Sequence, residues 1–205
     1  MLKSVALALA LCFGGAALAG EAGDAVFAER GPWALGDRVL NWQMTVDGPE
    51  AQGFASVSDG AVRMAEIADP SGGGRMLQLT VQAGPDGPDR KIGPFPLSTG
   101  DPALIYFLEQ TVRDMSSLTG GSPFYIQNRI KEALFNGGRI DRDGDRRIAV
   151  FSPFADDPNA ARMHGFQTLT LTFVLTGDND PIRRMTAETG PLESGAPYRA
   201  DLVLQ

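Results

Sequence analysis

One segment departs from the pattern of the rest of the chain and reads DPALIYFLEQTVRDMSSLTGGSPFYIQNRIKEALFNGG from residue 101 to residue 138. Its apolar residues recur every three or four positions, which is the period of an α-helix with one buried face. The first half carries this stripe on Leu104, Leu108, Val112, Met115 and Leu118. The second half carries it on Ile126, Ile130 and Leu134. The segment therefore predicts two amphipathic helices.

Both predicted helices have clear start and stop signals. Asp101-Pro102 and Ser122-Pro123 each combine a side chain that can cap a helix with a proline suited to the first turn. Glycine pairs at residues 120–121 and 137–138 end the two periodic stretches. Because the link between them is so short, the helices should form a hairpin, side by side or at a sharp angle.

The sequence on either side of this hairpin alternates apolar and polar residues, which is the period of a half-buried β-strand. Such stretches cover residues 38–46, 61–67, 76–82, 167–176 and 198–204. Loop sequences rich in glycine, proline and aspartate separate them. Short alternating strands favour antiparallel pairing, because parallel strands are buried on both faces and need long crossovers. The predicted fold class is α+β, an antiparallel β-sheet or sandwich with a helical hairpin inserted mid-chain.

Residues at the centre of each apolar pattern are expected to be buried together. They are Trp42, Leu79, Leu171, Phe173 and Leu202 in the strands, with Leu108 and Ile130 in the helices. Their burial would give a chain of this length a substantial hydrophobic core.

The N-terminus has the features of a secretory signal peptide. Lys3 is followed by an apolar stretch at residues 5–13 and then by Ala17-Leu18-Ala19, which is a typical cleavage sequence. Acylation of Cys12 is the alternative, but bulky Leu11 precedes it and the apolar stretch before it is short. We therefore expect a cleaved signal at residues 1–19 and one exported α+β domain at residues 20–205, periplasmic or secreted, without a transmembrane segment.

Composition restricts the function of the exported domain. Cleavage after Ala19 removes Cys12, the only cysteine, and with it disulfides, thiol catalysis and cysteine-bound metals. The formal net charge of the full chain is −7, and the loss of Lys3 makes the remainder more acidic. An acidic surface is poorly suited to nucleic acid or anionic lipid, whose phosphates attract basic residues.

A possible calcium loop begins at Asp141, with Asp143 and Asp145 at the alternate positions from which oxygens converge on the ion. Two later positions do not fit, because Arg146 replaces the required glycine and Ser152 replaces the final carboxylate. A β-hairpin with Asp143-Gly144 as a type I′ turn explains the charges better, since it would place Asp141 opposite Arg146. Weak calcium binding at the three aspartates remains an alternative.

His164 is the only histidine, which limits the enzyme classes open to the chain. A zinc site would have to rely on carboxylates, and no Gly-x-Ser-x-Gly nucleophile elbow is present. A copper site at Met163-His164 is less favoured than a loop histidine beside a core methionine. A binding or accessory role is thus favoured over an enzyme, with no cofactor, and a carboxylate-based hydrolase is the alternative.

The helical hairpin has more aromatic surface than one buried stripe requires. These residues are Tyr106, Phe107, Phe124, Tyr125 and Phe135, with Arg113, Arg129 and Lys131 beside them. One explanation is that the hairpin packs against a curved sheet and buries two faces. The other is a binding site, formed by these eight residues, for a partner protein or for an apolar ligand held between helices and sheet.

Overall fold

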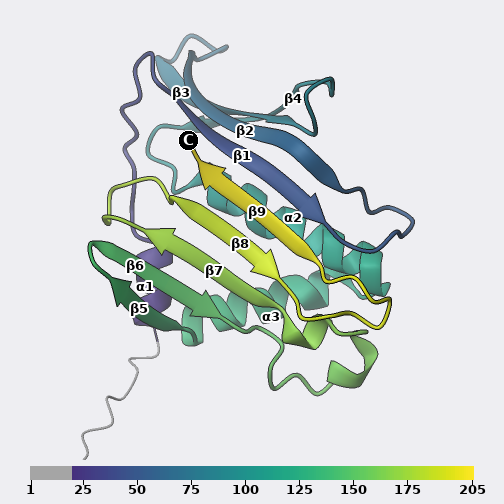
Figure 1. Ribbon diagram of the computed structural model, residues 1–205. Helices are drawn as coiled ribbons and strands as arrows, with labels where there is room; N and C mark the ends of the chain where they lie inside the picture. The colour runs from purple at the N-terminus through teal and green to yellow at the C-terminus, as the bar shows by residue number, and fades with distance from the viewer. Residues whose placement is uncertain (1–19) are drawn as a thin grey trace, which may run out of the picture.

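A single nine-stranded antiparallel sheet forms the framework of the protein (Figure 1). The computed structural model describes residues 20–205, so the predicted signal peptide and Cys12 lie outside the described residues. The strands are β1 (Val39–Asp47), β2 (Val57–Ala68), β3 (Arg75–Gln82), β4 (Arg90–Pro96), β5 (Arg139–Asp143), β6 (Arg146–Phe151), β7 (Thr170–Leu175), β8 (Arg184–Glu188) and β9 (Arg199–Leu204).

The order of the strands joins the two halves of the chain in the middle of the sheet. It runs β4-β3-β2-β1-β9-β8-β7-β6-β5, so two meanders meet where β9 pairs with β1. Every neighbouring pair is antiparallel. The C-terminal strand therefore closes the sheet, and the first strand cannot pair fully until the last one has been made.

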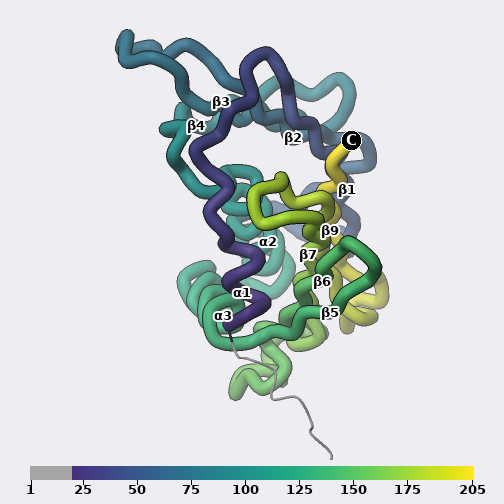
Figure 2. The backbone as a smooth tube through the Cα atoms, turned by 90° about the vertical axis from the view of Figure 1, so that its left-hand side faces the viewer, coloured from purple at the N-terminus to yellow at the C-terminus, as the bar shows by residue number. Residues whose placement is uncertain are grey.

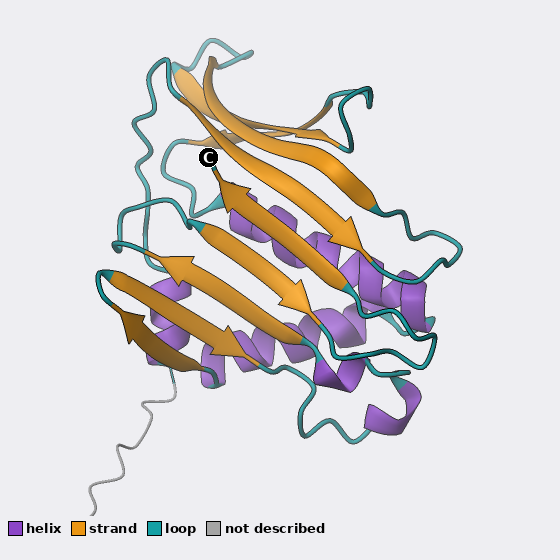
Figure 3. Cartoon of the chain, viewed as in Figure 1, coloured by secondary structure: helices purple, strands orange, loops and turns teal. Residues whose placement is uncertain are grey.

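The helices lie on one face of the sheet (Figure 3). They are α1 (Glu21–Val26), α2 (Pro102–Thr119) and α3 (Pro123–Asn136), with short 3-10 turns at Ala160–Arg162 and Phe166–Thr168. Asp101 caps α2 by accepting hydrogen bonds from the backbone nitrogens of Ala103 and Leu104, and Gly120 ends the helix with φ 68°. The predicted α+β fold, with a helical hairpin between β4 and β5, is confirmed.

Alternating burial on the strands explains why one face holds the core. In β7, Leu171, Phe173 and Leu175 are buried, while Thr172 and Val174 between them are only half-buried. Phe107 of α2 packs edge to face against Phe173, with ring centroids 6.0 Å apart. The helices cover the face on which these buried side chains lie, and no helix covers the opposite face (Figure 3).

Most of the predicted core residues are buried. The strand residues Trp42, Leu79, Leu171, Phe173 and Leu202 and the helix residue Ile130 all belong to the core. Leu108 was predicted wrongly, because it is only partly buried. The side of α2 that faces the sheet contains Leu104, Phe107 and Met115, and Leu108 lies beside it.

Two strands were not predicted because local sequence opposes them. β4 contains Pro94 and Pro96, which cannot donate to a ladder, but β4 is an edge strand where this loss is tolerated. β8 is short and begins and ends with the charged residues Arg184 and Glu188. Their side chains lie on the face of the sheet that no helix covers, where charge costs little.

The hairpin between β5 and β6 forms, but its turn lies one residue later than predicted, so Asp141 lies opposite Ile148 and not opposite Arg146. Asp143 pairs with Arg146, so the two turn residues are Gly144 and Asp145. Gly144 has φ 58°, and a glycine at the first central position avoids the positive φ that Asp143 would need in the predicted turn. Arg142 consequently lies opposite Arg147, and Arg147 instead pairs with Asp178.

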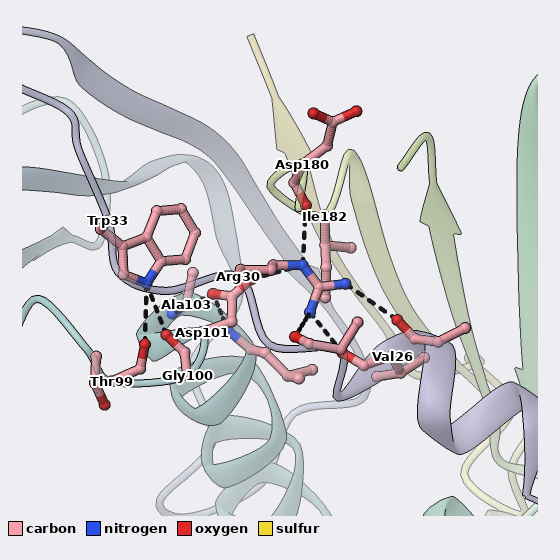
Figure 4. A network of polar contacts seen from close by, with 12 residues as sticks. Val26, Arg30, Trp33, Thr99, Gly100, Asp101, Ala103, Asp180 and Ile182 are labelled. Atoms are coloured by element: carbon pink, nitrogen blue, oxygen red, sulfur yellow. Dashed lines mark hydrogen bonds and ion pairs between the residues drawn. The ribbon is translucent and has the colours of Figure 1, made fainter. Parts of the chain in front are cut away.

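The segment between α1 and β1 is fixed to the helical layer by a buried arginine (Figure 4). Arg30 donates hydrogen bonds to the backbone carbonyls of Val26 (2.8 Å) and Asp180 (2.9 Å), and its Nε lies 3.9 Å from Asp101 Oδ2. Burial lowers the pKa of Arg30, and burial raises the pKa of Asp101 although Arg30 opposes this. Trp33 Nε1 donates to the Gly100 carbonyl at 2.8 Å. These contacts hold the start of α2 in place.

Candidate functional site

A pocket of about 350 Å³ lies between α2 and the β1–β3 part of the sheet. Figure 2 shows the sheet curved here, with β3 and β4 turned toward the side on which the helices lie. Most of the apolar lining comes from three strands, with Met44 and Val46 in β1, Val57 in β2 and Val81 in β3. Ala55, in the exposed loop between β1 and β2, also lines the pocket.

Four polar side chains line this pocket, three of them on α2. Tyr106, Gln110 and Asp114 lie on successive turns of that helix, and Arg90 enters from the first residue of β4. The spacing of four residues puts the three helical side chains on one face, toward the sheet. The pocket thus has a polar row along α2 and an apolar wall on the sheet.

Asp114 is buried, with 4% of its surface exposed. Gln110 Nε2 donates a hydrogen bond to Oδ1 at 2.6 Å, and the Tyr198 hydroxyl donates to Oδ2 at 3.0 Å. Burial raises the pKa of Asp114, and these two hydrogen bonds with the charge of Arg113 offset only part of that effect. Burial, followed by the charge of Asp114, places the pKa of Tyr198 well above its usual value.

Tyr106 is also buried, and its hydroxyl has a weak partner. The hydroxyl oxygen lies 3.5 Å from Met44 Sδ, and a thioether sulfur is a poor acceptor. The guanidinium carbon of Arg90 lies 5.9 Å from the centre of the Tyr106 ring, within the range of a cation–π contact. Burial raises the pKa of Tyr106, and the charge of Arg90 acts in the opposite direction.

A second concave surface, of about 320 Å³, lies between α2 and α3 and includes Phe27, which follows α1. We call it the outer groove; its lining residues are Phe27, Ile105, Leu108, Glu109, Val112, Gln127, Ile130, Lys131, Leu134 and Phe135. Two of its apolar side chains are well exposed, Ile105 at 49% and Phe135 at 61%. Phe27 stacks on Phe135 with ring centroids 5.2 Å apart, which extends the apolar surface.

The structure divides the aromatic residues that the sequence grouped into one candidate site. Tyr106 and Phe107 of α2 are both buried, and Tyr106 lines the pocket between α2 and the sheet. Phe124 is 72% exposed and Phe135 is 61% exposed, while Tyr125 is partly buried. The five side chains therefore do not form one continuous exposed surface.

The three basic residues of that candidate site lie in different surroundings. Arg113 forms a weak exposed pair with Glu109 (3.7 Å) and donates to Gln110 Oε1 (3.0 Å). Lys131 lines the outer groove with Phe135. Arg129 points the other way and donates to Asp157 at 2.8 Å.

Tyr125 and Arg129 attach α3 to the loop after β6 through the buried carboxylate of Asp157. Tyr125 donates from its hydroxyl at 2.8 Å, and the backbone nitrogen of Asn159 donates at 2.8 Å. Burial raises the pKa of Asp157, but these hydrogen bonds and Arg129 outweigh it, so the pKa lies below its ordinary value. A structural role accounts for the position of Tyr125 and Arg129.

The aspartates of the proposed calcium loop do not converge. Asp141 pairs with Arg139 and Asp143 lies opposite Arg146, while Asp145 occupies the turn. Within residues 20–205, no group of three or more His, Cys, Asp or Glu side chains is arranged to hold a metal ion.

His164 lies in an exposed loop and its neighbour Met163 is buried in the core. His164 Nδ1 is 2.8 Å from Glu193 Oε2, and its φ of 52° is the single positive value at a non-glycine residue between positions 20 and 205. The two side chains of Met163-His164 therefore face different surroundings, one apolar and one aqueous.

Asp114 is the single acidic residue in the lining of the α2 pocket. Glycoside hydrolysis commonly uses two carboxylates about 5 to 9.5 Å apart, so this lining supplies one of the pair. Across the described part of the chain, no helix is both long enough and apolar enough to cross a membrane.

No protein-family model, curated protein or solved structure matches this chain. The site must therefore be judged on its own geometry. Arg90, Gln110 and Asp114 were not recognised from the sequence, although one signal was present. Asp114 is seven residues after Phe107, so a carboxylate lies on the same side of the helix as an aromatic residue that the predicted stripe did not include.

Proposed function

We propose that this protein is an exported binding domain whose ligand is a small, largely apolar molecule held in the pocket between α2 and the curved sheet. The observation that carries the proposal is the make-up of that pocket. Small-molecule sites are concave and mainly apolar, with a few polar groups that fix the orientation of the ligand. Met44, Val46, Val57 and Val81 supply the apolar wall, and the row on α2 supplies the polar groups.

The buried carboxyl of Asp114 supports the same proposal. Groups whose pKa is shifted by burial are more frequent at functional sites than elsewhere, because such sites use burial and neighbouring charges to set the pKa that their chemistry needs. Asp114 combines a raised pKa with a place in the lining of a pocket. The volume of about 350 Å³ also falls in the range typical of small-molecule sites, about 300 to 1,000 Å³.

Calorimetric titration of residues 20–205 with 1-octanol tests this function. We expect saturable binding of one molecule with a Kd of about 1 mM or lower, which corresponds to about −4 kcal/mol. Ala55→Trp places an indole in the pocket from an exposed loop position, so it should abolish binding while the fold remains intact. Ala155→Trp, at an exposed alanine away from the pocket, is the matched control and should bind as the wild type does.

Two results would contradict the proposal. One is the absence of saturable octanol binding to the folded wild-type protein. The other is binding that is unchanged in Ala55→Trp but lost in Phe135→Asp, which would move the site to the outer groove.

The outer groove favours a second candidate function, the binding of a partner protein through the helical hairpin. The exposed side chains of Ile105 and Phe135 suit an apolar side chain of the partner, and Lys131 suits an acidic neighbour of that side chain. Pull-down from a periplasmic extract, followed by native mass spectrometry, should recover a partner that Phe135→Asp loses. Phe124→Asp, at an exposed phenylalanine that does not line the groove, is the control and should retain it.

A further inference from the structure

Arg90 is the cationic group in the lining of the α2 pocket. Among the ion pairs formed within residues 20–205, none involves Arg90, although the adjacent Asp89 pairs with Arg63 at 3.5 Å. Arg90 is exposed and its guanidinium is positioned over the Tyr106 ring, 5.9 Å from the centroid. The charge is therefore placed at the pocket beside Tyr106, whose hydroxyl the guanidinium also approaches, and the remaining N–H groups of this exposed side chain are available to another molecule.

Tyr106 adds a second donor at the same end of the pocket. Its hydroxyl is buried and its partner is the thioether sulfur of Met44. A carboxylate oxygen accepts a hydrogen bond far better than a thioether does, so an anion near Arg90 would gain from Tyr106 as well.

The acidic group of the pocket lies two turns further along α2, and its charge still acts on Tyr106. Asp114 follows Tyr106 by eight residues on α2, which corresponds to about 12 Å along the helix axis. Each of its carboxyl oxygens already accepts a hydrogen bond, from Gln110 and from Tyr198. The apolar side chains of the strands supply the rest of the wall.

We infer that the ligand is an apolar molecule with a terminal carboxylate, bound with the carboxylate at Arg90 and Tyr106 and with its apolar part along the strands. This inference rests on the proposed binding function and specifies the class of ligand. A group the size of a water molecule occupies about 30 Å³, so a pocket of about 350 Å³ holds a molecule of about ten heavy atoms. Octanoate has this size and is the probe of choice.

The test compares three probes with one chain length, octanoate, 1-octanol and octylamine, by calorimetry at pH 7 and low salt. Octanoate should bind the wild type at least about tenfold more tightly than octanol, because a charge-assisted pair with arginine is added, and octylamine should bind more weakly than either. Arg90→Gln should reduce the octanoate-to-octanol affinity ratio to about one. Lys91→Gln is the matched control, since Lys91 is the next residue of β4 and is exposed on the opposite face.

The outcomes separate this inference from the function on which it rests. If octanol binds but octanoate binds no better, or if the preference survives in Arg90→Gln, the carboxylate assignment is wrong and the binding function stands. If neither probe binds the folded protein, the binding function fails as well. If Lys91→Gln removes the preference as Arg90→Gln does, the effect is one of net charge and the assignment to Arg90 is wrong.

Discussion

The two helices of the hairpin start from similar sequence signals but have different roles in the structure. Each begins with a proline after a residue that can cap a helix, and each has an apolar stripe, but Asp101 caps α2 whereas the side chain of Ser122 makes no capping hydrogen bond to α3. Yet α2 buries nine residues and α3 buries three. α2 packs against both the sheet and α3, and it contributes Asp114 and Thr111 to the interior. α3 has one buried stripe and leaves Phe124 and Phe135 exposed.

The apolar stripe accounts for all the buried residues of α3, which packs against the helices α1 and α2, but for only part of those of α2, which packs against the sheet as well. A helix that contacts two layers buries side chains outside its stripe, and some of these are polar. Such buried polar groups cost free energy unless they are hydrogen-bonded. Asp114 of α2 meets this requirement through Gln110 and Tyr198, and it lies in the lining of the candidate site.

The largest expected effect separates a buried phenylalanine of α2 from an exposed one of α3. Phe107→Ala removes a ring that is packed against Phe173, so the free energy of unfolding should fall by about 3 to 5 kcal/mol. Phe124→Ala should change it by less than about 0.5 kcal/mol. Urea denaturation measures both. Equal losses in the two variants would mean that α2 is no more buried than α3.

The next effect concerns the carboxylate that attaches α3. Asp157→Asn should lower the free energy of unfolding by about 2 to 3 kcal/mol at pH 7, because Arg129 and Tyr125 lose a charged acceptor. The pKa of Asp157 is lowered in the folded protein, so its stabilisation is present above the unfolded pKa and is lost as pH falls through the folded pKa. The deficit of the variant should therefore shrink between pH 7 and pH 3.

Denaturation at both pH values, with Asp156→Asn as the exposed neighbouring control, measures this trend. A deficit that is the same at pH 3 and pH 7 would show that the charge of Asp157 contributes nothing to the attachment of α3.

Asp114 of α2 should show the opposite and smaller pH trend. Its folded pKa is raised by burial, so the unfolded chain releases this proton at a lower pH and wild-type stability falls as pH rises between the two pKa values. Asp114→Asn removes this loss. The Tm of the variant relative to the wild type should therefore be more favourable at pH 7 than at pH 4.

Glu109→Gln, an exposed change on the same helix, serves as the control for Asp114 and should show no such trend. A relative Tm for Asp114→Asn that falls between pH 4 and pH 7 would indicate that the buried carboxyl is stabilised as an anion.

The smallest effects distinguish the two exposed phenylalanines of α3. Phe135→Ser should cost about 1 kcal/mol, because Phe135 stacks on Phe27 with centroids 5.2 Å apart. Phe124→Ser should cost less than about 0.5 kcal/mol, since no aromatic contact of Phe124 is present among the described residues. Thermal melts of the two variants measure the difference. Identical Tm values would mean that the stack on Phe27 adds nothing.

The candidate site was only partly predictable from the sequence. Tyr106 was identified as surplus aromatic surface, and an apolar ligand between helices and sheet was one of the two interpretations offered. Arg90 was not recognised, because it is the first residue of β4, and the prolines of that strand interrupt the alternating pattern by which a strand is predicted. Asp114 was not recognised as a buried group, because a single carboxylate on a helix is usually exposed.

What the sequence determined by itself is the set of elements with a strong period. The helical stripes at residues 101–136 and the alternation at residues 38–46 or 167–176 are local properties, and each is strong enough to specify a helix or a strand with one buried face. The turn at Gly144 was predicted to exist, but its register depended on which residue takes the positive φ. The two possible turns differ by one residue, and the local sequence makes little difference between their free energies.

Only the tertiary structure decided which residues form the pocket and the attachments. The lining of the α2 pocket joins β1, β2, β3, β4 and α2, and their meeting depends on the curvature of the sheet, which turns β3 and β4 toward the helices. Arg30 likewise contacts Asp180, far away in sequence, through a backbone carbonyl that any residue could supply. Contacts of this kind cannot be predicted from a periodic sequence pattern, because their energy depends on the distances between segments and not on the order of residues within one segment.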